Sequence, residues 1–301
     1  MNKTIIISYC LLAFGLMACS SDDPTADTPA TTPTVDDGRT AVNITTRSEG
    51  DPQGAQLQAG LYMVNYADGQ ADELLATDNY VNNQLLTWAN DSWNTATPIY
   101  WNDDATAADF YAYAPYKENV SNARSLPVSV QADQSTTDAY AKSDLLWGCA
   151  LGKTASDGSF DLTLTHRLSQ LTVVVTAEGG FDENELQASD VSVTIGGTKT
   201  QGTMDLATGE LSVTGEAQEV RCLSVGNLNY KAILMPQLVS FSNLITVNWK
   251  GNLYVLQNAF KLEACRQYTL TVKLKKTKSG FDIGIEGWDI LPEDFGGTIG
   301  G

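Results

Sequence analysis

Basic residues are scarce in this 301-residue sequence. It contains 18 lysines and arginines against 36 aspartates and glutamates, which gives a formal net charge of −18 at pH 7. A chain this acidic repels the phosphates of nucleic acids and the headgroups of anionic lipids. The composition therefore predicts that nucleic acid is not a partner, and the charge is typical of a protein that must stay soluble in crowded surroundings.

Patterns that support catalysis or metal binding are also missing. His166 is the single histidine, so any Ser–His–Asp or Cys–His pair would have to use it, and it lies between two predicted strands. The five cysteines show no CxxC spacing, which argues against a zinc site, and no phosphate-binding loop or EF-hand loop occurs. We therefore expect no enzyme activity, no catalytic residue, no metal site and no cofactor.

Three cysteines lie beyond the N-terminal region, namely Cys149, Cys222 and Cys265. Their odd number is compatible with one disulfide and a free thiol, or with three buried thiols. The sequence does not choose between these states.

Long apolar runs are absent apart from one near the N-terminus. Ile5–Met17 is shorter than the roughly 18 residues that a membrane-spanning helix needs. It follows Lys3 and ends at Ala18-Cys19, which is the charged, apolar and small-residue order of an export signal. A small residue before a cysteine resembles the lipobox of bacterial lipoproteins, in which the cysteine sulfur receives the lipid. We expect residues 1–18 to be a signal peptide and Cys19 to be lipidated; the alternative is a plain secretory signal cut elsewhere.

The next segment is rich in serine, threonine, proline and aspartate. Within residues 20–37 Val35 is the only large hydrophobic residue, so this part of the chain cannot form a core. We expect residues 19–39 to be a disordered tether, with the lipid as the anchor to the outer membrane. The acidic residues within Ser20–Asp23 resemble the surface-export signal of Bacteroidetes lipoproteins.

Short strand-like runs separated by turn signals make up the rest of the sequence. The clearest alternation of apolar and polar residues is Tyr268–Lys275. The runs are 41–46, 60–66, 98–101, 110–115, 126–131, 160–165, 171–176, 191–195, 209–213, 220–225, 231–235, 244–249, 253–257, 268–274 and 281–285. Turn signals include Gly196-Gly197 and Thr208-Gly209, and helical periodicity is scarce. This pattern predicts an all-β protein of two β-sandwich domains, 40–166 and 167–301.

Aromatic residues cluster within about thirty positions of the first predicted domain. Buried, they would form a sandwich core, which alternation along strands favours. Exposed, they would offer surfaces on which sugars or a host protein stack. The cluster consists of Trp88, Trp93, Tyr100, Trp101, Phe110, Tyr111, Tyr113 and Tyr116.

Several segments, taken in order and with their spacing, resemble the fimbrillin family of Bacteroidales, the subunits of type V pili. They include an N-terminal strand that ends in Thr-Arg, an aromatic strand followed by proline, and a histidine followed by Leu-Ser-x-Leu. The segments are Ala41–Arg47, Asp109–Tyr116, Asp133–Ser135, Ser143–Leu146, Phe160–Leu171, Ala232–Gln237 and Gly287-Trp288. In place of a common glycine turn before the last long strand, this chain has Ala264–Gln267.

The resemblance implies two tandem transthyretin-like, Greek-key β-sandwich domains in a lipoprotein of the outer membrane. It also implies that an arginine-specific protease removes the N-terminal segment with its lipid. A neighbouring subunit then fills the vacated groove with its own strand, which is β-augmentation repeated into a fibre. Arg47 is the first candidate for the cleavage site and Arg39 the second. The alternative is that neither is cut, as in anchor subunits.

The resemblance places the donor strand near the C-terminus. The candidate side chains are Tyr268, Leu270, Val272, Leu274, Phe281, Ile283 and Ile285. The alternative is that these residues form an ordinary final hairpin.

The resulting prediction is a structural or adhesive subunit of a cell-surface pilus, with other pilus subunits and the processing protease as partners. The alternative function is an anchored lipoprotein that binds a glycan or a host protein and does not polymerise. The sequence does not separate stalk, tip and anchor roles.

Overall fold

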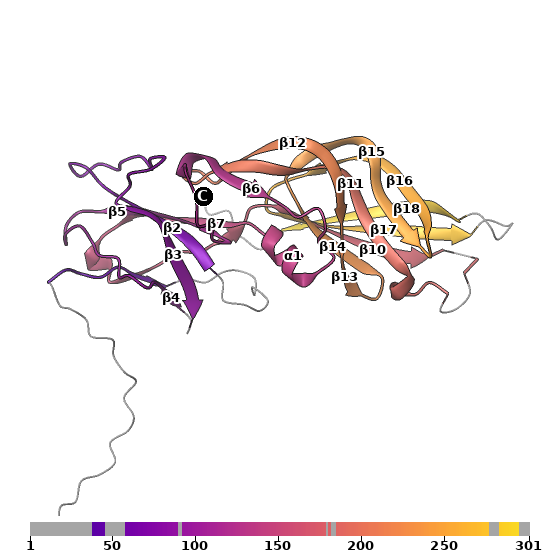
Figure 1. Ribbon diagram of the computed structural model, residues 1–301, viewed down its shortest axis with the longest axis horizontal. Coiled ribbons are helices and arrows are strands. Elements are labelled where there is room, and N and C mark those ends of the chain that lie inside the picture. The colour runs from indigo at the N-terminus through magenta and orange to yellow at the C-terminus, as the bar shows by residue number, and fades with distance from the viewer. Residues whose placement is uncertain are drawn as a thin grey trace, which may run out of the picture. The chain divides into compact units, whose positions relative to one another are not determined.

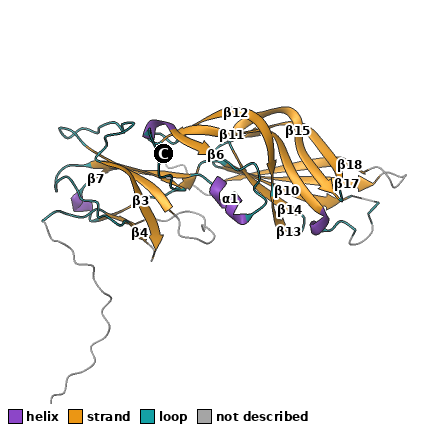
Figure 2. Cartoon of the chain, viewed as in Figure 1, coloured by secondary structure: helices purple, strands orange, loops and turns teal. Residues whose placement is uncertain are grey.

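The computed structural model describes residues 38–45, 58–89, 92–178, 180–181, 185–276 and 283–294, with Lys276 and the last range described by backbone alone. Strands predominate in this part of the chain, and α1 (Thr137–Ser143) is its one α-helix (Figures 1 and 2). The strands are β1 (Asn43–Thr45), β2 (Gln58–Asn65), β3 (Val81–Ala89), β4 (Ser92–Asn94), β5 (Ala108–Ala114), β6 (Leu126–Ser129), β7 (Leu146–Lys153), β8 (Ser159–Asp161), β9 (Thr165–His166), β10 (Ser169–Ala177), β11 (Val191–Asp205), β12 (Glu210–Arg221), β13 (Leu223–Gly226), β14 (Asn229–Leu234), β15 (Gln237–Trp249), β16 (Asn252–Leu262), β17 (Arg266–Lys276) and β18 (Ile283–Asp294).

The first sheet has the strand order β4-β3-β2-β5-β7-β9. Its central strand β5 is buried at every position, and β2 is buried at six consecutive positions. One face carries Leu61 and Phe110 into a core shared with β1 and β8, here called the first core, while the other face carries Tyr62 and Tyr113 into a separate core. Burial on both faces explains why these strands are almost continuously apolar rather than alternating.

The second half of the chain forms a β-sandwich. One sheet has the order β13-β14-β10-β17-β18, and the other has the order β12-β11-β15-β16. Alternate side chains from both sheets meet in one core, here called the second core, among them Val173 from β10, Val247 from β15 and Leu270 from β17. Alternation along each strand places these residues on the inner face. The all-β sandwich prediction is confirmed.

The long strand β11 corrects a sequence prediction. Gly196-Gly197 is not a turn but a bulge within β11, where the register with β12 shifts between Ile195 and Thr198. A side chain at Gly196 would collide with the carbonyl of Asn243, so close approach of β15 requires glycine there. The first part of β11 pairs with β15, and Gln201–Met204 pairs with β6.

The division into domains at residues 166 and 167 stays a prediction. The strands before this point form the first sheet and the β1–β8 pair, and the strands after it form the sandwich. The exception is β6 from the first half, which pairs with β11 from the second half. Gln134 strengthens the connection, because its amide donates to Ile233 O at 2.7 Å and accepts from Ile233 N at 2.8 Å. The contacts group residues 39–301 into one compact unit.

The described thiols of Cys149, Cys222 and Cys265 are all free, so neither half of this region carries a disulfide. Burial raises the pKa of the Cys222 thiol, and burial together with Asp109 raises the pKa of Cys149. Both shifts suppress the thiolate, which is the reactive form.

Candidate assembly site around the first strand

The short strand β1 lies between two other backbone segments. On one side it pairs in parallel with β8, through Asn43–Ser159, Ile44–Phe160 and Thr45–Asp161. On the other side Val42 N donates to Ile99 O at 2.8 Å, and Trp101 N donates to Thr40 O at 3.0 Å. The segment 40–45 therefore satisfies backbone groups on both of its edges.

Alternate side chains of this segment point into the first core. Ile44 is buried and Val42 is half-buried, whereas Ala41, Asn43 and Thr45 are exposed. The aromatic residues of this core are Trp101, Phe110 and Phe160, whose ring centroids lie 4.6 to 6.2 Å apart. Ile44 and Val42 thus contribute to an aromatic-lined core that is otherwise built by the body of the protein.

Polar contacts at the surface hold the ends of the segment. Thr45 Oγ1 donates to Asp161 Oδ1 at 2.8 Å, and Thr40 Oγ1 donates to Asp104 Oδ1 at 2.8 Å. The guanidinium of Arg39 lies 4.0 Å above the ring centroid of Tyr100. These contacts are exposed to water, so each contributes little compared with burial of Ile44.

Two donors in this core have no acceptor. Trp93 Nε1 and Trp101 Nε1 are buried and make no hydrogen bond in the structure. Leaving such a group unsatisfied costs about 1–3 kcal/mol. The core that receives Ile44 is therefore packed with aromatic rings but leaves buried indole N–H groups without hydrogen bonds.

The predicted donor residues lie on two strands with different surroundings. β17 lies between β10 and β18, and its side chains Tyr268, Leu270, Val272 and Leu274 are buried in the second core. Ile283 and Ile285 lie on β18, which pairs only with β17 among the described strands. Only the backbone of these two isoleucines is described.

Three predicted site residues lie outside the described part of the chain: Cys19, Arg47 and Phe281. Arg39 is described and exposed. The structure therefore brings together Arg39 and the segment 40–45, and the C-terminal strands lie in the other sheet system.

The turn before β17 retains the geometry of the glycine turn that the sequence lacks. Cys265 has a φ of +60°, a left-handed conformation that glycine adopts most easily. The chain then enters β17 in register with β10, from Gln267 opposite Gln170 to Leu274 opposite Ala177.

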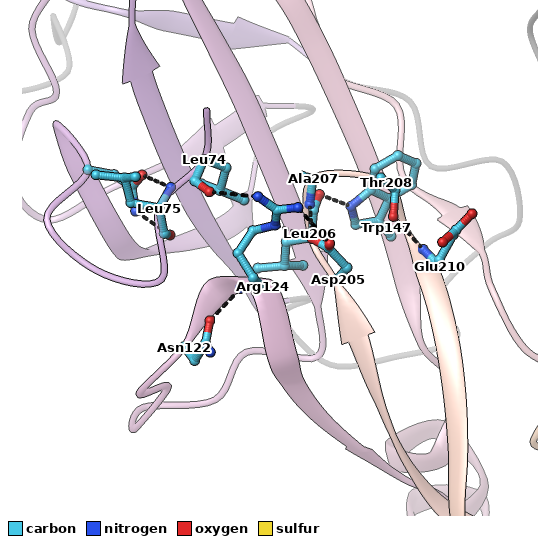
Figure 3. A network of polar contacts seen from close by, with 11 residues as sticks. Leu74, Leu75, Asn122, Arg124, Trp147, Asp205, Leu206, Ala207, Thr208 and Glu210 are labelled. Atoms are coloured by element: carbon cyan, nitrogen blue, oxygen red, sulfur yellow. Dashed lines mark hydrogen bonds and ion pairs between the residues drawn. The ribbon is translucent and has the colours of Figure 1, made fainter. Parts of the chain in front are cut away.

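A polar network joins the two halves away from β1 (Figure 3). Arg124 donates to both carboxylate oxygens of Asp205, at 2.7 and 3.0 Å, and to Leu74 O at 3.3 Å. Trp147 Nε1 donates to Leu206 O at 2.8 Å. Burial opposes ionisation of Asp205, but hydrogen bonds from Arg124 and Ala207 outweigh it and lower its pKa.

The resemblance motifs have structural roles in this region. His166 Nδ1 lies 2.8 Å from Asp144 Oδ1, so the histidine pairs with the aspartate of the Ser143–Leu146 segment. Gln134 of the Asp133–Ser135 segment bonds to β14, as described above.

Neither a metal cluster nor a membrane helix emerges from the described residues. No group of three or more histidine, cysteine, aspartate or glutamate side chains there could hold a metal ion. None of the helices in the same ranges is long and apolar enough to cross a membrane.

Burial of the predicted aromatic cluster is confirmed for Trp93, Trp101, Phe110, Tyr111 and Tyr113, whereas Trp88, Tyr100 and Tyr116 are half-buried. The sequence does not predict the pairing of segment 40–45 with Ile99 and β8, because Ile99 lies 57 residues beyond Val42 and Ser159 lies 116 residues beyond Asn43. Alternating apolar residues in 42–44 were the available signal.

The fold defines an all-β sandwich protein, and similar solved structures share this arrangement. A proposed cell adhesion protein of Bacteroides uniformis superposes with a TM-score of 0.66 at 24% identity, covering 86% of this chain and 100% of that one. A second, from Bacteroides ovatus, has a TM-score of 0.60 at 16% identity and covers 83% and 97%. At these identities the likeness shows the fold.

The chain belongs to the fimbrillin-like family, whose model matches residues 46–288. A proposed fimbrium subunit of Bacteroides uniformis, Fim1C, is 26% identical over all of this chain and 99% of its own length. A proposed fimbrium tip subunit of Bacteroides ovatus is 31% identical over 43% of this chain and 24% of its own length. The prediction of a fimbrial subunit is confirmed at the level of the family.

Proposed function

We propose that the chain is a subunit of a cell-surface pilus, exported as a lipoprotein through Cys19 and assembled after an arginine-specific protease cuts it at Arg47. The observation that supports this proposal is the position of segment 40–45 between Ile99–Trp101 and β8. This segment ends two residues before Arg47, so one cut would separate it from the body of the protein.

Loss of the segment would expose a site suited to another strand. Trp101 N and Leu162 N donate to Thr40 O and Thr45 O, and Ile99 O accepts from Val42 N. Without the segment these groups would face an open slot with Phe110 and Phe160 at its base. A strand from a neighbouring subunit can satisfy the same groups and place alternate apolar side chains in the core.

The geometry favours β18 over β17 as the donor. β17 has strand neighbours on both sides and places four buried side chains in the second core, so its departure would open that core. β18 lies at the sheet edge and can leave while β10 and β17 stay paired. Among the predicted donor residues, Ile283 and Ile285 on β18 therefore suit the donor role better than the four residues on β17.

The alternative is a surface lipoprotein that keeps its first strand, stays monomeric and binds a glycan or a host protein. It is favoured by the pairing of segment 40–45 on both of its edges, which holds the segment in place in the uncut chain.

Limited digestion of the purified, non-lipidated protein with an arginine-specific protease tests the proposal. We expect one early cut after Arg47, loss of the N-terminal segment, and ladders on native gels with fibres in electron micrographs. Arg47→Lys should block both the cut and the ladders, whereas Arg39→Lys should change neither. A protein that is cut after Arg47, loses the segment and stays monomeric would refute strand exchange and favour the alternative.

A further inference from the structure

A surface hollow lies directly beside the start of segment 40–45. Its volume is about 310 Å³, near the lower end of the range for small-ligand sites. It is lined by Arg39, Tyr80, Val81, Asn82, Gln84, Pro98, Ile99 and Tyr100. The lining therefore comes from the residues before β1, from the start of β3, and from the segment that pairs with β1.

The lining combines polar groups, two tyrosines and a smaller apolar surface. Val81, Pro98 and Ile99 supply the apolar surface, and Ile99 is itself buried. Tyr80 is 47% exposed although it is aromatic, so much of its ring is open to a ligand. The surface that the hollow exposes is open and mostly polar, which suits a ligand rich in hydroxyl groups that also packs on a tyrosine ring.

The amide side chains are held in place by residues behind them. Asn82 Nδ2 donates to Asn79 O at 2.7 Å, and Asn79 Nδ2 donates to Asn82 Oδ1 at 2.9 Å. Gln84 Nε2 donates to Thr95 Oγ1 at 2.9 Å. Because these contacts fix the two side chains, a ligand would lose little free energy in ordering them.

The chemistry of the lining fits a sugar ring better than an ion or an apolar molecule. A pyranose has one face of C–H groups, which packs on tyrosine rings, and an edge of hydroxyls, which bond to amides and phenols. Arg39 is the one charged residue of the lining and is stacked on Tyr100, while the formal charge of −18 on the whole chain disfavours anionic ligands. We propose that this hollow binds one neutral pyranose unit of a glycan.

The site is complete only while the N-terminal segment is in place. Arg39 covers the Tyr100 ring, Ala41 bridges Tyr100, and Val42 bonds to Ile99. Release of the residues up to Arg47 would remove Arg39 and free the strand edge of Ile99 and Tyr100. Sugar binding and release of the segment therefore oppose each other by linkage, and this second part rests on the function proposed above.

Saturation-transfer NMR on the intact, non-lipidated protein tests the first part. The probes are the methyl pyranosides of glucose, galactose, mannose, fucose and N-acetylglucosamine, with N-acetylneuraminic acid as the anionic comparison. We expect transfer to at least one neutral sugar, and at least a tenfold weaker affinity in Tyr80→Ala. Phe241→Ala is the matched control, because this aromatic on β15 is 70% exposed outside the hollow and its loss should leave the affinity unchanged.

Three results would overturn the sugar site: no transfer to any neutral sugar, transfer to the anionic sugar alone, or equal affinity in wild type and Tyr80→Ala. Arg39→Ala should weaken binding in the uncut chain, which separates the role of Arg39 from cleavage. Circular dichroism of each variant verifies that it is folded.

The linkage is measured on protein cut after Arg47. At a sugar concentration ten times Kd, dissociation of the cut segment should become about elevenfold less favourable. Unchanged dissociation would overturn the linkage while leaving the sugar site intact. A chain that resists cutting but still binds sugar would count against the proposed processing alone, so the two failures are distinguishable.

Discussion

Two strands near opposite ends of the described chain, β1 and β17, are held in different ways. β1 has three residues, places only Ile44 fully in a core, and depends on water-exposed contacts at its ends. β17 has eleven residues, has a strand on each side, and buries four apolar side chains. Free energy of burial is therefore concentrated in β17, and β1 is the strand that can leave without unfolding the rest.

The comparison is tested most strongly at the centre of β17. Leu270→Ala removes a fully buried side chain from the second core and should lower the free energy of unfolding by about 3–4 kcal/mol. Chemical denaturation of the folded protein measures the loss. Leu253→Ala on β16 is the control, because this leucine is 64% exposed and its loss should cost less than about 0.5 kcal/mol.

The equivalent change in β1 should lower the free energy of global unfolding less, and should favour local release of β1 more. Ile44→Ala should cost about 1–2 kcal/mol of global stability, below the usual range for buried isoleucine, because release of β1 limits the loss. The same variant should be digested faster after Arg47. A global loss as large as that of Leu270→Ala, with unchanged digestion, would show that β1 unfolds only with the whole protein.

The ion pair between Arg124 and Asp205 tests whether the two halves lose stability together. Asp205→Asn should lower the free energy of unfolding by about 1 kcal/mol at pH 7, because both partners are partly exposed. The pKa of Asp205 is lowered in the fold, so its stabilisation is present above its unfolded pKa of about 3.9 and is lost as pH falls through the lower folded value.

Denaturation curves of wild type and Asp205→Asn between pH 7 and pH 2 should therefore converge at the acid end. A constant difference across this range would show that the carboxylate charge contributes nothing. Separate transitions for the two halves in the variant would show that the ion pair couples them.

The smallest expected effect is at the turn that leads into β17. Cys265→Gly should raise the free energy of unfolding by up to about 1 kcal/mol, because glycine adopts a φ of +60° without the strain that a side chain causes. Loss of the partly buried thiol and greater freedom of the unfolded chain offset part of this gain. Cys265→Ala is the control, since it removes the sulfur and keeps the strain, and it should not be stabilising.

Sequence patterns predicted the strands in which the order of apolar and polar residues follows the burial of the side chains. The 268–274 run alternates and corresponds to β17. The 110–115 run is apolar throughout and, up to Ala114, lies within β5, which is buried on both faces. β3 was missed because Asn82, Asn83 and Gln84 interrupt its apolar pattern, although Asn83 forms hydrogen bonds to Tyr113 and Lys117. α1 was missed because one short helix carries too few residues to show a period.

The candidate site was less predictable than the strands. The Ala41–Arg47 segment was identified through the resemblance, and its strand is present as β1. Its position between Ile99 and β8 depends on pairings over long sequence separations, which local patterns do not encode. The sugar-sized hollow was unpredictable for the same reason, since Arg39, Tyr80 and Tyr100 meet only in the folded chain.

The length of β11 has a mechanical consequence. Its beginning is hydrogen-bonded to β15 in the second half, and its end to β6 from the first half. Tension pulling the two halves apart along this strand would load the β6–β11 bonds in shear, so that they share the force instead of opening one at a time. In a fibre built from such subunits, β11 would carry tension between the two halves of each subunit. The bulge at Gly196-Gly197 would be the part of this strand that stretches most easily.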